Sequence, residues 1–275
     1  MTEPDWLRLN RANWDERVPV HLGPGSDYGH HDLKRGPYLL HRIEEEELGP
    51  VAGKRLLHLQ CHFGVDSLAL AQKGAIVTGL DFSAPAIDAA RALSAETGIP
   101  ATFVHANIYD ARTAVDGLFD RVFTSWGTIV WLPDIVGWAR VVASMLAPGG
   151  EFYFADVHPA CLVFDDEVPG TDGMPGWFAP YFHTDALVLD QASDYADPDA
   201  RLVNTRTHQF IHPVASVVQA LLEAGLRLTM LREHNTLAWK AFANRVETDG
   251  RLYRLPGKSW LPLSFSLKAR KDFFF

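Results

Sequence analysis

Two apolar runs separated by a glycine turn most constrain the fold of this chain. Residues 56–59 have the composition of a buried strand in a parallel sheet, and a tight turn at Gly64 follows them. Residues 65–73 then carry apolar side chains at helical spacing, and a second apolar run, residues 75–80, ends on Asp81. The pattern predicts a β-turn-α-β unit with an acid at the tip of its second strand.

The spacing of that acid indicates what the unit binds. Asp81 lies 17 residues after Gly64, close to the offset of about 20 residues expected of a carboxylate that binds ribose hydroxyls. A glycine permits close approach of the backbone to a ligand, a helix start offers amide donors, and a carboxylate accepts two hydroxyl donors. We therefore expect a cofactor that contains a nucleoside.

This stretch resembles the first two motifs of class I S-adenosylmethionine (SAM)-dependent methyltransferases of the small-molecule branch. The family's acid-x-Gly-x-Gly-x-Gly turn corresponds here to His58-x-Gln60-x-His62-x-Gly64, so three of its four marked positions differ. His58 stands where the family often has an acid that contacts the methionine part of SAM. The resemblance implies cofactor-binding residues at the turn and at the second strand tip: His58, Gln60, Cys61, His62, Gly64, Asp81 and Phe82.

Three later segments continue the resemblance in the family's order. Residues 100–107 predict a third strand, residues 117–127 contain a fourth, and a Pro-Gly-Gly sequence at 148–150 leads into an aromatic-rich fifth. The tips of the third and fourth strands add five expected cofactor-binding residues: Asn107, Ile108, Ser125, Trp126 and Gly127. In the family, a side chain at the place of Asn107 accepts a hydrogen bond from the adenine amine. The alternative is that Asn107 is a plain turn residue.

The resemblance implies a Rossmann-like α/β fold with a seven-stranded, mostly parallel sheet and an antiparallel last strand. Residues 1–50 are expected to form an N-terminal helical cap that includes a helix over 39–48, and residues 51–275 the SAM-binding methyltransferase domain. In this family such an N-terminal segment often folds over the cofactor. Tyr28 is our candidate cap residue, and an ordinary surface aromatic is the alternative.

A β-rich insertion is expected after the fifth strand, over about residues 157–211. Residues 187–189 and 202–208 predict a hairpin within it. In class I methyltransferases an excursion above the strand tips builds acceptor specificity. The insertion is rich in aromatic residues, so either a lid over the acceptor or a dimer contact would use it.

The expected chemistry is methyl transfer from SAM to an O, N or C nucleophile of a small-molecule acceptor. An in-line displacement mainly needs alignment in a dry pocket, and a base only where the acceptor arrives protonated. His158, at the tip of the fifth strand, is the candidate general base, and a structural histidine in the turn before Pro159 is the alternative. The expected acceptor-binding residues are His31, Trp131, Trp177, Phe178 and Tyr181. The alternative is that the aromatic residues among them pack within a lid.

The composition and charge of the chain limit which classes of partner it is expected to bind. The net charge of −9, without a large basic cluster, argues against a nucleic-acid partner. No run approaches the ~20 apolar residues of a membrane span, so no membrane partner is expected. The two cysteines are too few for a disulfide framework and the N-terminus lacks an apolar signal core, which favours a cytoplasmic protein. The sequence leaves open whether this protein is a monomer or a homodimer. The 12 histidines show no metal-ligand spacing, so we expect no metal.

Two other functions remain open at this point. A nicotinamide (NAD(P))-dependent oxidoreductase would use a similar α/β core, but only Gly64 remains of the Gly-x-Gly-x-x-Gly turn that lets a pyrophosphate approach. A non-catalytic SAM-binding module is the other alternative. The altered turn favours such a module, whereas the aromatic insertion favours an enclosed acceptor site.

Overall fold

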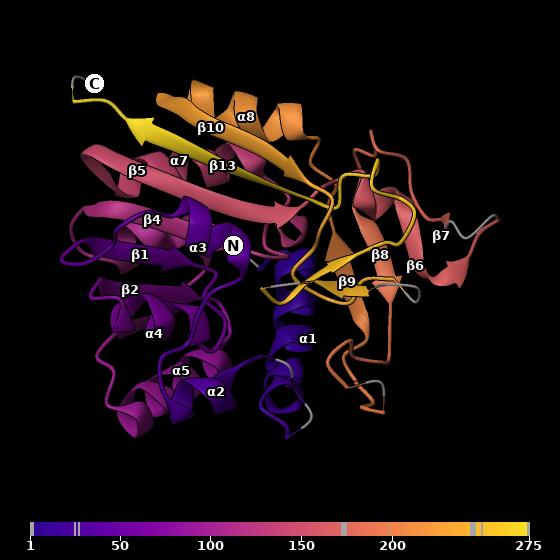
Figure 1. Ribbon diagram of the computed structural model, residues 1–275, viewed down its shortest axis with the longest axis horizontal. Helices are drawn as coiled ribbons and strands as arrows, with labels where there is room; N and C mark the ends of the chain where they lie inside the picture. The colour runs from indigo at the N-terminus through magenta and orange to yellow at the C-terminus, as the bar shows by residue number, and fades with distance from the viewer. Residues whose placement is uncertain are drawn as a thin grey trace.

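Seven strands form one sheet in the order β10-β13-β5-β4-β1-β2-β3 (Figure 1). This computed structural model describes residues 3–24, 26, 28–171, 175–197, 199–242, 246–248 and 250–273. β1 pairs in parallel with β2 and β4, β2 with β3, and β4 with β5, whereas β13 is antiparallel to both β5 and β10. The expected mostly parallel sheet with an antiparallel last strand is confirmed. The strand bounds are β1 (Arg55–Leu59), β2 (Ile76–Asp81), β3 (Thr102–His105), β4 (Phe119–Ser125), β5 (Leu146–Val157), β10 (Leu226–His234) and β13 (Ser264–Lys271).

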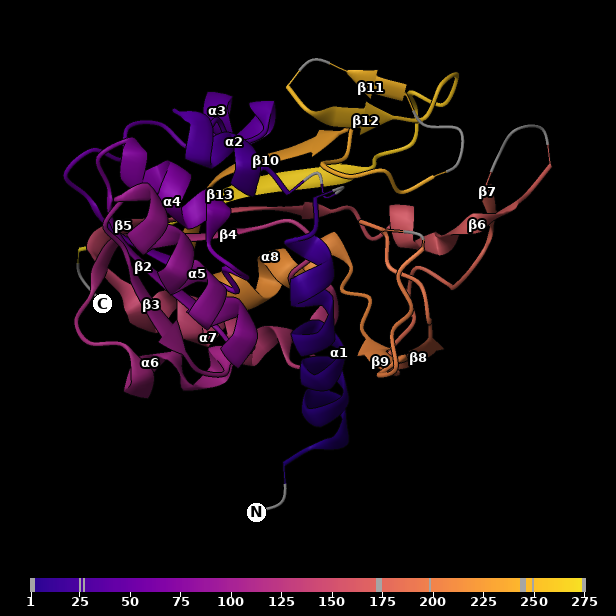
Figure 2. The same cartoon turned by 90° about the horizontal axis from the view of Figure 1, so that it is seen from below.

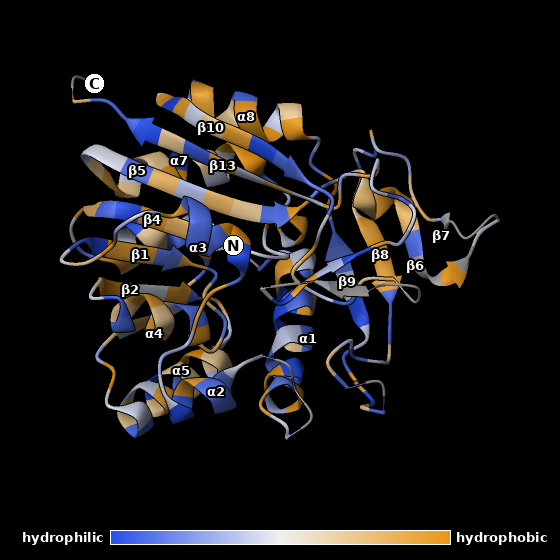
Figure 3. Cartoon of the chain, in the orientation of Figure 1, coloured by the Kyte–Doolittle hydropathy of each residue, from blue (hydrophilic) through white to orange (hydrophobic). Residues whose placement is uncertain are grey.

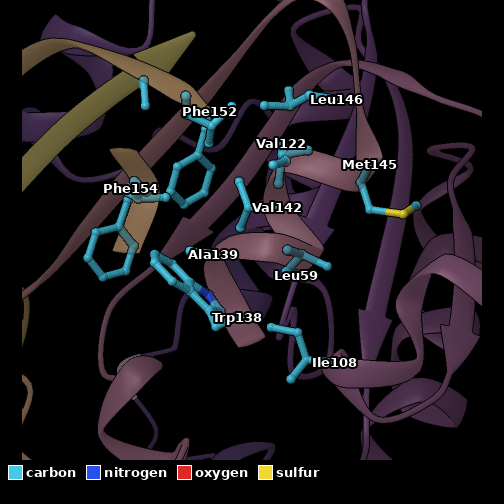
Figure 4. Packing of buried hydrophobic residues seen from close by; sticks show 14 of the residues in the cluster. Leu59, Ile108, Val122, Trp138, Ala139, Val142, Met145, Leu146, Phe152 and Phe154 are labelled. Atoms are coloured by element: carbon cyan, nitrogen blue, oxygen red, sulfur yellow. The ribbon is translucent and has the colours of Figure 1, made fainter. Parts of the chain in front are cut away.

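Helices cover both faces of the sheet because each carries one apolar stripe. One buried cluster joins the sheet to α4 (Val65–Gln72) and α5 (Ala84–Thr97), and a second joins it to α7 (Ile135–Met145) and α8 (Val214–Glu223). Figure 4 shows Trp138 of α7 packed toward Phe152 and Phe154 of β5, with ring centroids 5.5 and 5.4 Å away. The remaining short helices are α2 (His30–Arg35), α3 (Arg42–Glu47), α6 (Ala111–Ala114), η1 (Ile108–Asp110), η2 (Ile129–Trp131) and η3 (Cys161–Val163).

The N-terminal helix α1 (Asp5–His21) crosses the carboxyl ends of the parallel strands, and the insertion lies beyond it (Figures 1 and 2). Asn10 fixes α1 to strand β9 (Arg206–Gln209), because its side chain donates to His208 O at 2.8 Å and accepts from His208 N at 2.7 Å. Asn13 donates to Asn204 O at 2.6 Å. The open end of the sheet is therefore closed by side chain-to-backbone hydrogen bonds.

The described residues of the insertion form two hairpins. β8 (Leu187–Asp190) and β9 (Arg206–Gln209) pair antiparallel, close to the strands expected at 187–189 and 202–208. β6 (Phe164–Pro169) pairs with β7 (Pro175–Trp177), a hairpin that the sequence did not predict. A further hairpin, β11 (Val246–Thr248) with β12 (Leu252–Arg254), lies in the connection before the last strand. Short strands between loops give a weak hydropathy signal, which explains why the sequence did not indicate them.

Two bounds differ from expectation. The helix expected over 39–48 occupies only Arg42–Glu47, and residues 37–41 before it are outside any helix or strand. The Pro-Gly-Gly segment forms the start of β5 itself, where Gly149 has φ +77 and lies against the ring of Phe273.

In the part of the chain that the structure describes, no helix combines the length and apolarity needed to cross a membrane. The division of the chain at residue 50 stays a prediction.

Candidate cofactor-binding site

The turn after β1 is built from unusual backbone conformations. Gly64 precedes α4 with φ +80, and a Cβ there would lie 2.7 Å from the ring of Phe103, so only glycine fits. Gln60 and His62 also have positive φ, 57° and 51°, which costs a non-glycine residue about 1–3 kcal/mol. Such conformations persist where the surroundings fix them, and they cluster at binding sites.

Asp81 closes this turn from the neighbouring strand. Its carboxylate accepts hydrogen bonds from His62 N at 2.8 Å and from Ser83 N at 2.9 Å. Burial raises the pKa of Asp81 to about 6, against backbone hydrogen bonds from Ser83, His62 and Phe82 that lower it. The carboxylate that was expected to bind ribose therefore also fixes the glycine turn, and its remaining lone pairs are available to a ligand.

Asn107 lies at the same edge of the sheet. Asp81 pairs with His105 in the β2–β3 ladder, and Ala106 N donates to Asp81 O at 2.9 Å, so Asn107 follows directly. The Asn107 side chain accepts from Tyr109 N at 3.0 Å and caps η1. The structure thus brings Asp81 and Asn107 together, while Asn107 also has the local turn role. Ile108 beside it is buried, and Phe82 is half-buried.

His58 points into the core. Its Nδ1 lies 2.8 Å from Ser67 Oγ, and its ring packs edge-on against Phe123. Burial lowers the pKa of His58 to about 3, so the ring is neutral. Cys61 is also buried, and burial raises the pKa of its thiol. Neither side chain offers a negative charge for a cofactor ammonium group.

A buried polar cluster connects α1, the turn and the insertion. We name it the Asp194 cluster, and its members are Arg17, His21, His62 and Asp194. Asp194 accepts from Arg17 at 2.8 Å and lies 3.1 Å from His21 Nε2. His21 Nδ1 lies 2.9 Å from His62 Nε2. Burial acts to raise the pKa of Asp194, but the hydrogen bond from His21 and the charge of Arg17 outweigh it and hold the pKa below its usual value.

The hydrogen bonds of this cluster fix its tautomers. Asp194 is ionised and can only accept, so His21 carries its proton on Nε2. Burial lowers the pKa of both histidines, so His21 Nδ1 is unprotonated and accepts from His62 Nε2. The ring of His62 then keeps an unprotonated Nδ1.

Sequence reasoning missed three members of this cluster, Arg17, His21 and Asp194. The available signal was a stripe of polar residues on one face of α1, all of which are buried: Asn10, Asn13, Arg17 and His21. Tyr28, the expected cap, stacks on His21 with ring centroids 4.4 Å apart and lies 5.5 Å from His62. The structure therefore places Tyr28 beside the turn after β1.

The loop after β4 is held by Asp156 at the end of β5. This carboxylate accepts from Thr128 N at 2.9 Å and from Ile129 N at 3.1 Å, and also from Gly127 N. Trp126 has φ 56, and its indole donates to Glu44 of α3 at 2.6 Å. Ser125 is buried at the end of the strand. The three residues expected here thus lie at the carboxyl end of β4, next to the turn.

His158 occupies a turn with both ring nitrogens engaged. Its Nδ1 accepts from Ala160 N at 3.0 Å, so Nε2 carries the proton and donates to Glu233 at 2.9 Å. Burial lowers the pKa of His158, against the hydrogen bond to Glu233. In this geometry the ring has no unused lone pair, so a role as general base stays a prediction that would require these bonds to open.

The expected acceptor-binding residues do not form one group. Trp131 packs edge-on against Trp14 of α1, with ring centroids 5.3 Å apart, and so belongs to the strand tips. Trp177 and Phe178 are exposed in the insertion, and the hydroxyl of Tyr181 accepts from Val214 N at 3.3 Å. His31 is exposed on α2 and contacts His30.

The chemistry of the site fits SAM. Three carboxylate or amide oxygens around the strand tips are buried and lack a hydrogen-bond partner among the described residues: Asp15 Oδ1, Glu44 Oε2 and Gln60 Oε1. All three are acceptors. The ribose hydroxyls, the adenine amine and the ammonium group of SAM are all donors. Gln60 is held by its amide nitrogen, which donates to Thr128 O at 3.0 Å, and Asp15 lies close enough to raise the pKa of Asp81.

Two other features bear on ligands. A cavity of about 280 Å³ lies at the opposite, amino end of the strands, between Lys54, Arg121 and Gly149. Ligands of open α/β sheets bind at the carboxyl ends, so this cavity is a poor candidate for the cofactor. Within the described ranges, no group of three or more His, Cys, Asp or Glu is arranged to hold a metal ion.

Comparisons with known proteins agree with this geometry. Residues 56–150 match the family model described as a methyltransferase domain. A ubiquinone biosynthesis O-methyltransferase from Proteus mirabilis is 32% identical over 122 residues, which are 44% of this chain and 49% of that enzyme. The chain therefore spans about half the length of the curated relatives it matches.

Solved structures extend the likeness in fold to most of the chain. A Listeria monocytogenes protein assigned as an S-adenosylmethionine-dependent methyltransferase has a TM-score of 0.60 at 18% identity, and the match covers 89% of this chain and 98% of that one. The glycopeptide N-methyltransferase MtfA, complexed with S-adenosylhomocysteine, has a TM-score of 0.54 at 16% identity, over 89% and 90% of the two chains. At these identities the comparison concerns the fold.

Proposed function

We propose that the chain is a class I SAM-dependent methyltransferase and transfers the methyl group of SAM to an O, N or C nucleophile of a small-molecule acceptor, which the methyltransferase-domain match over residues 56–150 supports. The observation that carries the proposal is the link between the Gly64 turn and Asp81 across two strand tips. This link places a backbone free of side-chain bulk beside a carboxylate. That pair of features suits a ribose next to the turn.

The residues at the strand tips would hold SAM, which supplies a methyl group on a sulfonium when bound. Asp81 would accept from the ribose hydroxyls and Asn107 from the adenine amine. Residues 125–127 would line the methionine side. The helix α1 would exclude water, because Trp14 packs on Trp131 and His62 over the carboxyl ends of the strands. Alignment in such an enclosed site supplies most of the rate enhancement that methyl transfer requires.

His62 is better placed than His158 to take a proton from a hydroxyl acceptor. Its Nδ1 is the unprotonated end of the Asp194 cluster. A proton taken there would let Nε2 pass its own proton to His21 Nδ1, and the positive charge would then rest on His21 beside Asp194. ¹⁵N spectra of histidine-labelled protein test this assignment. We expect neutral rings with His21 protonated at Nε2, and a protonated Nδ1 on His62 would contradict it.

The proposed partner is a small-molecule acceptor that would approach from the side of the insertion. A cytoplasmic location and a monomeric or homodimeric state remain predictions. The relative from Proteus mirabilis methylates oxygen by name. Hydroxylated small molecules are therefore the first acceptors to screen.

Calorimetric titration with SAM, S-adenosylhomocysteine (SAH) and NAD tests the proposal. We expect binding of the two adenosyl-sulfur ligands and none of NAD. Incubation with methyl-labelled SAM and a panel of hydroxyl, amine and carbon acceptors then seeks a labelled product. Binding of NAD alone would overturn the proposal. Tight SAH binding without any product across the panel would favour a non-catalytic SAM-binding module.

A further inference from the structure

A buried carboxyl group of α3 faces the candidate site with one oxygen unused. Glu44 is fully buried. Its Oε1 accepts from the indole of Trp126 at 2.6 Å, whereas Oε2 has no hydrogen-bond partner in the ranges that the structure describes. An unpaired buried acceptor costs free energy. Glu44 therefore offers a vacant hydrogen-bonding position next to the carboxyl end of β4.

A second carboxyl group lies close to Glu44. Asp66 is in the first turn of α4, two residues after Gly64. Burial raises the pKa of Asp66 to about 6. Burial also raises the pKa of Glu44, and the proximity of Asp66 raises it further. The carboxyl group of Asp66 on α4 therefore acts electrostatically on that of Glu44 on α3.

One guanidinium faces this pair. Arg251 donates to the hydroxyl of Tyr38 and to Leu39 O, and its charge acts on both Glu44 and Asp66. Two carboxylates beside one guanidinium would leave one negative charge uncompensated. A monovalent cation placed beside Glu44 Oε2 would balance the charge and supply the missing donor.

The position of the pair points to a particular cation. The family's usual acid at the end of β1 is replaced here by neutral His58, which bonds to Ser67 in the core. Asp66 follows the Gly64 turn in the first turn of α4, and Glu44 is bonded to Trp126 at the carboxyl end of β4, so these two carboxyl groups can supply the charge that His58 lacks. We propose that Glu44, supported by Asp66, binds the ammonium group of the methionine part of SAM. The inference rests on the proposed function.

Cofactor binding should then release a proton. Asp66, with a pKa of about 6, titrates in the same range as the proposed release. The remaining titratable groups that face Glu44 or its indole partner keep one protonation state between pH 6 and 8, because burial raises the pKa of Tyr38 to about 12, raises that of Tyr153 and lowers that of His41 to about 4. The guanidinium of Arg251 also acts on Glu44. An ammonium group beside Glu44 favours its ionised form, so the affinity for SAH should rise from pH 6 to pH 8.

A comparison of two ligands tests whether Glu44 contacts the amino-acid part of the cofactor. SAH and 5′-methylthioadenosine share the adenosine and the thioether, but only SAH carries the amino acid. Calorimetry at pH 7 in phosphate and in Tris, which differ in ionisation heat, gives the affinity and the number of protons released. We expect Glu44→Gln to weaken SAH about 10- to 100-fold, to leave 5′-methylthioadenosine within about 2-fold, and to reduce proton release.

Three further variants distinguish a failure of the Glu44 assignment from a general loss of cofactor binding. Glu46→Gln changes an exposed carboxylate of the same helix, paired with Arg42, and should alter neither ligand. Asp81→Asn should weaken both ligands equally. Asp66→Asn should weaken SAH selectively and gives an independent reading if Glu44→Gln is unstable. Wild-type affinity of Glu44→Gln for SAH, or an equal loss of both ligands, would overturn the inference. Failure of the wild-type protein to bind either ligand would instead overturn the proposed function.

Discussion

The middle of the sheet and the carboxyl ends of its strands are both buried, but they are packed in opposite ways. Under α7, the rings of Trp138, Phe152 and Phe154 meet without hydrogen bonds between them. At the strand tips, the rings of His21 and His62 are also packed among aromatics, yet each is tied into the Asp194 cluster. Figure 3 shows mixed hydrophilic and hydrophobic colouring along α1, which contributes His21.

The difference separates stability from function. Apolar burial stabilises the fold in proportion to the area removed from water. Buried polar groups only recover what their desolvation costs, and they do so where the partners are complete. The strand tips retain acceptors without partners, so their arrangement is better explained by a ligand than by the stability of the fold.

The largest expected effect is a loss of stability when the apolar packing under α7 is disrupted. Trp138→Ala should lower the free energy of unfolding by about 3–5 kcal/mol, because it removes a fully buried indole and leaves a cavity. Urea denaturation measures the change. The control Leu222→Ala, at a residue 46% exposed on α8, should change stability by less than about 0.5 kcal/mol. Equal effects of the two substitutions would contradict the packing described here.

The substitution Asp194→Asn tests the Asp194 cluster at the carboxyl ends of the strands. It removes the charge that pairs with Arg17 and His21, which should cost about 3 kcal/mol because the pair is buried. We expect the loss to be local, with faster hydrogen exchange in α1 and unchanged exchange in α7. The exposed control Asp190→Asn should leave α1 protected. Uniform loss of protection across the sheet would mean that the two regions unfold as one unit.

The buried histidine of strand β1, His58, predicts a pH dependence of stability. The folded pKa of His58, about 3, is depressed below the unfolded value of about 6.5. Its contribution to stability is therefore complete above pH 6.5 and is lost as the pH falls toward 3, by about 1.4 kcal/mol per pH unit. His58→Gln should make the stability less dependent on pH between 6 and 4. An unchanged slope would show that other groups take up the protons.

The smallest expected effect concerns the ligand. Asp81→Ala should weaken SAM binding by about 1–3 kcal/mol, the scale of a lost charge-assisted hydrogen bond. Calorimetry measures it, with Asp88→Ala, an exposed acid on α5, as the control. Unchanged SAM affinity would remove Asp81 from the cofactor site and leave it only the role of fixing the turn.

The elements that the sequence predicted well are those with a strong local signal. The apolar runs ending at Leu59 and at Asp81 are strands within a residue or two of the expected bounds, since such runs have few alternatives to a buried strand. Asp81 and Asn107 lie at one edge, as expected of neighbouring parallel strands. The short strands β6 and β11 escaped prediction because their pairing partners, not their composition, define them.

The sequence by itself determined the sheet, its order of motifs and the edge at which a ligand would bind, because hydropathy and glycine spacing are local properties. Only the tertiary structure decided which polar groups meet at that edge. Asp194 reaches His21 across 173 positions of the chain, and Glu44 reaches Trp126 across 82. No local pattern encodes such pairs. They form because the chain buries these polar groups together, and burial requires each to find a partner.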